Sequence, residues 1–339
     1  MTAPLQTPTA AHRPMAGCLA PRRHPSAPES GGGKYSRLYP DLPPLDPSVS
    51  ALLGLGSSGA VCDGGLAAAD ANTEAGWPFF GQYIAHDITA DLSPLERSEH
   101  VLVDNQRVPR LNLECLYGAG PGGSPYMFDV EDPAKFLLGA GGFDLPRSAQ
   151  GIAIIADPRN DSHLFMNQMQ VALLRAHNAF VDAARAQGRP EDQLFASARQ
   201  AMTWHYQWIV VEEFLPKLVG AGLMADLRSG AVTLPLPEGL SVPYEFADAA
   251  YRYGHSQIRQ TYRINAASEP LSLFPDLLGF RPVPAEKTVD WALMFDGATP
   301  GGAQRSMRIS ERLPCALINM PEEVTGAVEE ERYRSLANR

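Results

Sequence analysis

Two histidines and an arginine stand out in this sequence because their types suit redox chemistry at a metal. His86 ends an aromatic-rich segment, Arg159 lies within Asp-Pro-Arg-Asn-Asp (157–161), and His255 ends Tyr-Arg-Tyr-Gly-His (251–255). One imidazole can bind a haem iron, and a second, neutral imidazole can move a proton between the oxygens of a peroxide. A fixed guanidinium can stabilise the charge that develops there. The three residues therefore have suitable types for cleaving a peroxide at a haem iron.

Each of these residues also has a purely structural interpretation. A single histidine in a helix is more often packed and hydrogen-bonded than a ligand. Taken alone, Arg159 is typical of a surface or helix-capping arginine. His177 and His205 lie inside amphipathic helix patterns and are predicted to be structural. The chemical interpretation depends on the residues occurring together.

Helical periodicity predicts the elements that position these residues. Apolar residues at helical spacing predict a helix over 76–88, which places Gln82 and His86 on one face. Further patterns predict helices over 163–186, over 193–215 with Pro216 closing it, and over 244–260, where Arg252 and Arg259 would share a face with His255.

The rest of the sequence shows little periodicity and no alternating strand pattern. Residues 89–162 are predicted to be largely irregular, and residues 265–339 to alternate short helices and loops. The predicted fold class is mainly α, a single large helical domain with long ordered loops and little β structure. Long ordered loops in a compact domain are commonly functional.

Composition sets the domain limits and excludes several partners. Residues 1–33 are rich in Pro, Ala, Ser and Arg and are predicted to be a disordered leader before a folded domain over 34–339. The net charge of −10 argues against nucleic acid or an anionic membrane as partner. No run reaches the roughly 18 apolar residues of a membrane span. No signal peptide is seen and the four cysteines lack Cys-x-x-Cys spacing, so a cytoplasmic or non-classically exported protein is expected.

A loop after the first predicted helix offers oxygens at alternate positions, as calcium coordination requires. Val108, Arg110, Asn112 and Glu114 would contribute backbone or side-chain oxygens together with Asp87. The same alternation is common in ordinary loops. A calcium site and a plain loop therefore both remain open.

Read together, these segments resemble the animal haem peroxidase family (the peroxidase–cyclooxygenase superfamily), and specifically its bacterial members. The resemblance covers roughly residues 34–339 in consistent order. Four segments carry it: the distal helix motif at 81–89, the calcium loop at 108–118, the arginine motif at 156–161 with the helix through 173–178, and the proximal motif at 251–255.

The resemblance implies a haem-dependent peroxidase that reduces hydrogen peroxide and oxidises a small organic or halide donor, in keeping with a response to oxidative stress. It assigns roles residue by residue: His86 as distal acid and base, Gln82 as its water-ordering neighbour, Arg159 as charge stabiliser, His255 as axial iron ligand, Arg252 as partner of a haem propionate, and Asp87 with Val108, Arg110, Asn112 and Glu114 as calcium ligands.

Three positions depart from the family pattern for covalently attached haem. Ala85 and Ser162 stand where ester-forming acids occur, and His163 stands where some members have a haem-bonded methionine. Neither Ala85 nor Ser162 can form such an ester. Non-covalent haem b is therefore expected, and the oxidation of chloride is disfavoured.

The resemblance also suggests that the C-terminal part of the domain is missing. Ser335–Ala337 look like the segment that precedes an asparagine supporting the proximal histidine, and the sequence stops at Arg339. His255 would then lack part of its support. Two alternatives follow: a truncated, non-catalytic remnant with poor haem binding, and a fatty-acid dioxygenase of the same superfamily. A dioxygenase needs a tyrosine three residues before the proximal histidine, where this sequence has Arg252, with Tyr251 one position further back.

Overall fold

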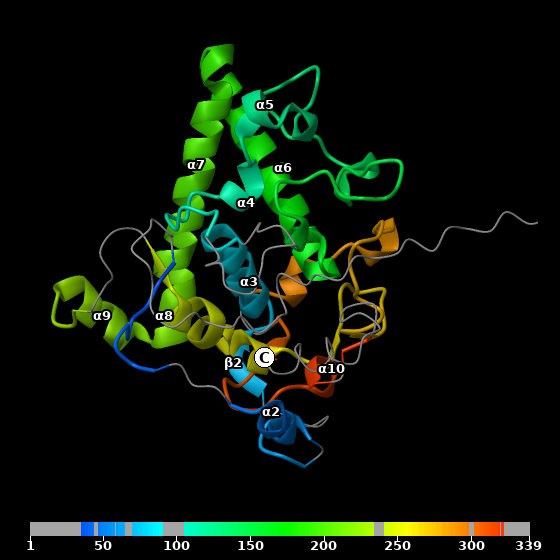
Figure 1. Cartoon of the computed structure of the whole chain (residues 1–339). Helices are drawn as coiled ribbons and strands as arrows, with labels where there is room; N and C mark the ends of the chain where they lie inside the picture. The colour runs from blue at the N-terminus through cyan, green and yellow to red at the C-terminus, as the bar shows by residue number, and fades with distance from the viewer. Residues whose placement is uncertain are drawn as a thin grey trace, which may run out of the picture.

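The computed structural model describes residues 35–43, 47–57, 59–64, 70–90, 105–233, 241–297, 302–318 and 320–321. These residues form a mainly helical structure (Figure 1). The two longest helices, α6 (Leu164–Ala186) and α7 (Leu194–Trp208), lie side by side and are joined by a short turn. The predicted leader over 1–33 lies outside the described residues.

Helix α3 (Trp77–Ile88) confirms the prediction for 76–88 and lies below the α6–α7 pair in Figure 1. Pro78 stands in its first turn, where a missing backbone N–H costs no helical hydrogen bond. Phe79 stacks on Phe165 of α6 with ring centroids 4.5 Å apart, and Tyr262 packs edge-on against both rings. All three side chains are almost fully buried, so this aromatic contact fixes α3 against the start of α6.

Helix α6 confirms the prediction for 163–186, whereas the prediction that Pro216 ends the next helix was wrong. The chain continues from α7 through the π-helix η5 (Ile209–Phe214) into α8 (Leu215–Val219). Pro216 stands in the first turn of α8, where the proline ring is tolerated.

The predicted helix over 244–260 was also wrong. The segment is the π-helix η6 (Glu245–Ala249) followed by the 3-10 helix η7 (Ala250–Gln257), with a break at Ala249 (φ −129°, ψ −78°). Arg259 lies beyond η7 and donates to the Arg305 carbonyl oxygen over 2.8 Å. Helical spacing therefore does not place Arg252 and Arg259 on one face with His255.

The remaining described elements are short. The strands form three two-stranded pairs: β1 (Tyr35–Ser36) parallel with β3 (Val242–Pro243), β2 (Asp70–Glu74) antiparallel with β6 (Arg305–Met307), and β4 (Thr261–Tyr262) antiparallel with β5 (Leu271–Ser272). The other α-helices are α2 (Val49–Gly56), α4 (Glu114–Tyr117), α5 (Gly120–Gly123), α9 (Ala221–Ser229) and α10 (Cys315–Ile318). The other 3-10 helices are η1 (Pro125–Met127), η2 (Ala140–Gly142), η3 (Pro158–Asp161), η4 (Glu191–Gln193), η8 (Ala285–Lys287) and η9 (Trp291–Leu293).

Over the described ranges, 105–162 holds only short helices, as predicted for an irregular region. No helix in the described parts of the chain is long and apolar enough to cross a membrane. Cys62 and Cys115 carry free thiols.

Candidate active site

Arg159 is presented by the short helix η3 (Pro158–Asp161), immediately before α6. Asp157 precedes this turn in extended conformation (φ −131°, ψ 109°). Its carboxylate accepts a hydrogen bond from the Arg159 backbone N–H over 3.0 Å. This is an N-cap, and Pro158 in the first turn needs no donor of its own. The local sequence Asp-Pro-Arg therefore sets the start of the turn.

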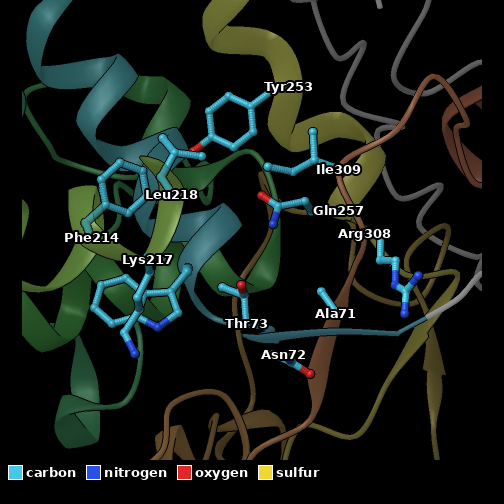
Figure 2. A pocket seen from close by; sticks show the side chains of 11 residues that line it. Ala71, Asn72, Thr73, Phe214, Lys217, Leu218, Tyr253, Gln257, Arg308 and Ile309 are labelled. Carbon is cyan, nitrogen blue, oxygen red and sulfur yellow. The ribbon is translucent and has the colours of Figure 1, made fainter. Parts of the chain in front are cut away.

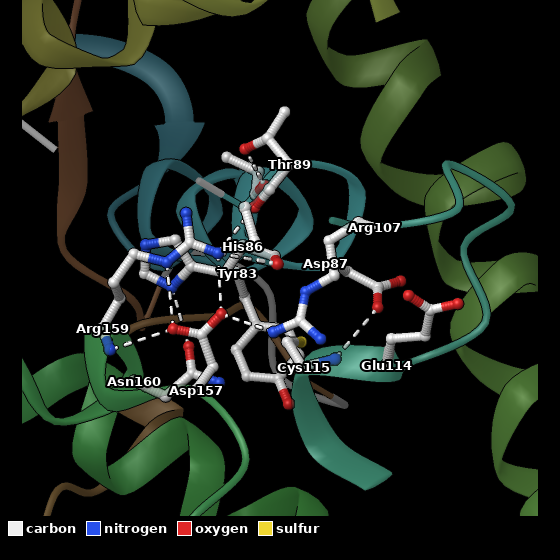
Figure 3. A network of polar contacts seen from close by, with 12 residues as sticks. Tyr83, His86, Asp87, Thr89, Arg107, Glu114, Cys115, Asp157, Arg159 and Asn160 are labelled. Carbon is white, nitrogen blue, oxygen red and sulfur yellow. Dashed lines mark hydrogen bonds and ion pairs between the residues drawn. The ribbon is translucent and has the colours of Figure 1, made fainter. Parts of the chain in front are cut away.

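The Asp157 carboxylate also holds the Arg159 side chain (Figure 3). Nε donates to Oδ1 over 2.9 Å and Nη2 donates to Oδ2 over 2.7 Å. Arg107 donates to the same Oδ2 over 2.8 Å. Burial alone raises the pKa of Asp157, but the hydrogen bonds and charge of Arg159 outweigh burial and hold this pKa well below its usual range. One carboxylate thus fixes two guanidinium groups, leaving a local excess of positive charge.

Arg159 lies at the C-terminal end of α3. Its Nη2 donates to the His86 carbonyl oxygen over 3.0 Å and to the Thr89 carbonyl oxygen over 2.6 Å. The last carbonyl groups of a helix lack helical donors, so a cation is stabilised there. The structure therefore brings Arg159 and His86 together, although they are 73 positions apart in the sequence.

The His86 ring is buried, with 6% of the residue exposed. Its Nδ1 lies 2.7 Å from the Asn160 amide oxygen. Because an amide oxygen only accepts, Nδ1 carries the ring proton and Nε2 carries the lone pair. Burial, with a further contribution from the Arg159 charge, lowers the pKa of His86 to about 4. His86 is therefore neutral near pH 7, with one nitrogen able to accept a proton.

Gln82 lies on α3 one helical turn before His86, and its side chain is hydrogen-bonded to His163. The His163 Nδ1 accepts from the Met166 backbone N–H over 3.4 Å and caps α6. The other nitrogen, Nε2, therefore donates to the Gln82 amide oxygen over 2.8 Å. Burial, followed by the charge of His86, lowers the pKa of His163 to about 3. His163 is thus a neutral donor that orients the Gln82 amide.

A buried ion-pair network holds η3 against α6. The Arg147 guanidinium contacts both oxygens of Asp161 at 2.7 and 2.8 Å and both oxygens of Asp144 at 2.8 and 3.1 Å. Asn167 of α6 donates to each carboxylate over 2.9 Å. Gly279 packs so closely on the Asp161 carbonyl oxygen that a Cβ atom would lie 1.9 Å from it. These contacts fix the position of η3 relative to α6.

His255 and Arg252, the predicted iron ligand and propionate partner, line a second region of the structure. Both face a cavity of about 260 Å³ that is also lined by Leu52, Cys62 and Leu313. The Arg252 Nε is buried and has no hydrogen-bond partner among the described residues. This cavity offers an imidazole and a guanidinium nitrogen to a bound anionic group, which fits the predicted types of residue for haem.

The described cavities do not join the two histidines. A larger cavity of about 440 Å³, drawn in Figure 2, lies between β2, α3, α8 and η7 and is lined by Trp77, Lys217 and Tyr253. Neither cavity includes His86, and only the smaller one includes His255. The Tyr251 hydroxyl donates to the Gly81 carbonyl oxygen over 3.1 Å, so η7 contacts α3 directly. The element that carries His255 therefore packs against the helix that carries His86.

The predicted calcium residues do lie beside one another. Asp87 is fully buried and accepts backbone N–H groups of Leu113 and Cys115 at 3.1 and 3.4 Å. The Glu114 carboxylate accepts from the Val108 N–H and from the Asn112 amide. Burial raises the pKa of Asp87, and the hydrogen bonds from the Leu113 and Cys115 backbone N–H groups offset part of this rise.

Several of the oxygens proposed as calcium ligands already accept hydrogen bonds from the protein. The Arg110 carbonyl oxygen accepts from Gln207 over 3.4 Å, and the Asn112 amide oxygen is buried without a partner in the described structure. Within the described residues, no group of three or more His, Cys, Asp or Glu could hold a metal ion. Calcium binding stays a prediction.

Sequence reasoning missed the residues that support the site. Asn160 was quoted only as part of a motif, and Arg107, Arg147 and Gln170 were not singled out. Their partners lie up to 87 positions away in the sequence. The position of Asn160, directly after the functional arginine, was the only local indication.

The structural predictions for two other histidines can be compared with their contacts. His177 is fully buried and bonds the Tyr117 hydroxyl and the Ala134 carbonyl oxygen, both at 2.9 Å. His205 is exposed and bonds the Ala201 carbonyl oxygen of its own helix. Both contacts belong to helix packing, in agreement with a structural role.

Comparison with known families identifies the fold. The family model for animal haem peroxidase matches residues 140–289, a range that includes Arg159, Arg252 and His255. Over this range, which is less than half of the chain, the sequence is similar to animal haem peroxidases. The matched range begins after α3, so Gln82, His86 and Asp87 lie outside it.

Individual relatives agree with this similarity. Heme peroxidase 2 of Caenorhabditis elegans is 32% identical over 116 residues, which are 30% of this chain and 16% of that protein. The structure of peroxidase A from Dictyostelium discoideum superposes with a TM-score of 0.62 at 13% identity, covering 90% of this chain and 70% of that chain. A fatty acid alpha-dioxygenase of Oryza sativa reaches a TM-score of 0.51 at 14% identity, covering 68% and 48%. At such identities these two structures show the mainly helical fold alone.

Proposed function

We propose that this chain is a haem-dependent peroxidase, which reduces hydrogen peroxide to water with two electrons and two protons while a small organic or halide donor is oxidised. The observation that carries the proposal is the pairing of a buried, neutral His86 with Arg159 at one end of α3. A proton acceptor beside a fixed cation is what peroxide cleavage needs.

Each residue near α3 has a separate task in this proposal. His86 Nε2 takes a proton from the peroxide and returns it to the departing oxygen. Arg159 stabilises negative charge on that oxygen, and Asp157 keeps its guanidinium in place. Gln82, oriented by His163, holds water or peroxide through its amide nitrogen.

Haem, when bound, supplies the iron and the electron transfer. His255 would hold the iron, and Arg252 would pair with a propionate through its buried guanidinium nitrogen. Ala85 and Ser162 carry no carboxyl group, so this haem would be non-covalent haem b. Asp87 and the 108–114 loop remain the proposed place for calcium.

A second candidate is a protein that binds haem poorly and does not turn over peroxide. The direct hydrogen bond from the Tyr251 hydroxyl to the Gly81 carbonyl oxygen favours it, because this bond holds η7 against α3.

Haem titration of the full chain separates the two candidates. A peroxidase takes up one equivalent of haem with a Soret band and then oxidises a dye in the presence of peroxide. His86→Ala is expected to lower kcat/KM for peroxide by about 10²- to 10⁴-fold, and Arg159→Ala by about 10²- to 10³-fold, without loss of haem. His255→Ala is expected to lose the haem itself.

His205→Ala is the matched control, because this exposed histidine hydrogen-bonds its own helix and otherwise contacts the Phe180 ring. It should leave haem uptake and turnover unchanged. A full chain that takes up no stoichiometric haem would overturn the peroxidase proposal and leave the second candidate.

A further inference from the structure

A chain of polar side chains runs behind His86 into the core. The Tyr83 hydroxyl donates to the Gln170 amide oxygen over 2.9 Å, and the Asn160 amide nitrogen donates to the same oxygen over 3.0 Å. The Asn160 amide oxygen then lies 2.7 Å from His86 Nδ1. The four residues come from α3, η3 and α6, and none of the three that support His86 has any exposed surface.

Such a chain is costly unless its hydrogen bonds are made. A buried amide that lacks hydrogen-bond partners destabilises the folded state. Apolar side chains of the same shape would fill this part of the core without that cost. The two amides and the phenol therefore have a role beyond packing. That role concerns the imidazole of His86, the last group in this series of hydrogen bonds.

We infer that Asn160 is a positioning residue that fixes the tautomer of His86, with Gln170 and Tyr83 holding the Asn160 amide in its orientation. The inference rests on the proposed function, in which His86 Nε2 must accept a proton. Because Asn160 offers its oxygen to Nδ1, the ring proton stays on Nδ1 and Nε2 keeps its lone pair. A ring with the opposite tautomer would offer a donor where an acceptor is needed.

The orientation of the Asn160 and Gln170 amides decides which ring nitrogen of His86 carries the proton. Gln170 uses its oxygen twice, and its amide nitrogen has no partner among the described residues. Turning over both amides would let that nitrogen donate to the oxygens of Tyr83 and Asn160. Asn160 would then donate to Nδ1, and the ring proton would move to Nε2. The two amides and the imidazole thus form one coupled arrangement with two possible directions.

The tautomer can be measured directly in the full chain prepared with ¹⁵N-labelled histidine and without haem. Protonated and unprotonated ring nitrogens differ in ¹⁵N chemical shift, and long-range ¹H–¹⁵N correlation spectra identify each one. The expected spectrum for His86, assigned by its loss in His86→Gln, has the proton on Nδ1. A proton on Nε2 in the unmodified chain would overturn the inference, whatever the variants do.

Variants test whether Asn160 is the cause. Asn160→Leu should give a mixture of tautomers or the Nε2 form, and in the haem-loaded protein it should lower kcat/KM for peroxide by about 10- to 100-fold. Asn160→Asp keeps an acceptor at Nδ1, and Gln170 can turn its amide nitrogen toward the new carboxylate. This variant should therefore keep the Nδ1 proton.

Asn178→Leu is the matched control, because Asn178 lies on α6, as Gln170 does, and its side chain bonds the Phe136 backbone at 2.8 and 2.9 Å. It should leave the His86 spectrum unchanged. An Asn160→Leu protein that folds and keeps the Nδ1 tautomer would contradict the inference. A chain that shows the Nδ1 tautomer but no peroxidase activity would contradict the proposed function alone.

Discussion

At the scale of single residues, Asp157 connects most of the groups in the candidate site. Its two oxygens accept hydrogen bonds from Arg159 and Arg107, and Asp157 is also the N-cap of η3, the turn that carries Asn160. The side chains of these three charged residues are only 4–16% exposed. The ion pairs are therefore poorly screened by water, and each partner depends on the others.

Asp157→Asn tests this dependence. The amide keeps the shape of the carboxylate but leaves two buried guanidinium groups without a counter-charge, which in comparable buried pairs costs about 3–5 kcal/mol. Urea unfolding followed by circular dichroism measures the loss. Asp132→Asn is the control, since Asp132 pairs with Arg185 and Lys135 at the surface and its loss should change the midpoint far less. Equal effects from both variants would contradict the argument.

At the scale of elements, the site depends on how η3 is held between α3 and α6. Arg147 holds one end of η3 through Asp161, and Arg159 joins η3 to α3 through the His86 carbonyl oxygen. Burial raises the pKa of Asp161 and is only partly offset by the Arg147 hydrogen bonds. Arg147 therefore favours the charged form of a carboxyl group whose charged form burial disfavours.

Arg147→Met is expected to destabilise the fold by about 3–5 kcal/mol, because it leaves Asp144 and Asp161 buried without a cation. The double variant Arg147→Met/Asp161→Asn removes one of the stranded charges and should regain part of the loss. Denaturant unfolding of the two single variants and the double variant gives the coupling. Strictly additive effects would show that Arg147 and Asp161 do not depend on one another.

The same elements show what the sequence can and cannot predict. Helices α3 and α6 were predicted within one residue at each end, because their apolar residues recur with the α-helical period. The segment 244–260 has apolar residues that fit the same period, yet it folds as a π-helix and a 3-10 helix. Its tyrosines pack against α3, and such tertiary contacts override local propensity.

The candidate site was predictable to the extent that residue type determines it. His86 and Arg159 were selected from their chemistry and Gln82 from the family resemblance, and the structure places all three on or beside α3. Asn160 and Gln170 were not selected, because a buried amide leaves no periodic pattern. Only the folded chain shows that Gln170, 84 positions beyond His86, reaches it through Asn160.

At the scale of the whole molecule, three buried neutral histidines make stability depend on pH. Burial is the largest cause in each case and lowers the pKa of His86 to about 4, of His163 to about 3 and of His177 to about 4, against 6.5 when unfolded. Because the histidine pKa is lower in the folded state, the unfolded chain binds protons at a higher pH than the folded chain does. The contribution of each buried neutral histidine to stability is therefore complete above pH 6.5 and is lost as the pH falls toward the folded-state pKa.

The free energy of unfolding should consequently fall between about pH 6.5 and pH 4.5 in the chain without haem. In the middle of this window each histidine adds roughly 1 kcal/mol per pH unit to the slope of the unfolding free energy. The three histidines together therefore approach the slope expected when unfolding takes up three protons. Asp87 and Asp161, whose pKa values burial raises, oppose the loss toward the acid end. Urea unfolding at a series of pH values measures the slope. His177→Gln, remote from the site, should reduce that slope by one proton, and a slope that is flat from pH 7 to pH 5 would show that these histidines are not buried as neutral groups.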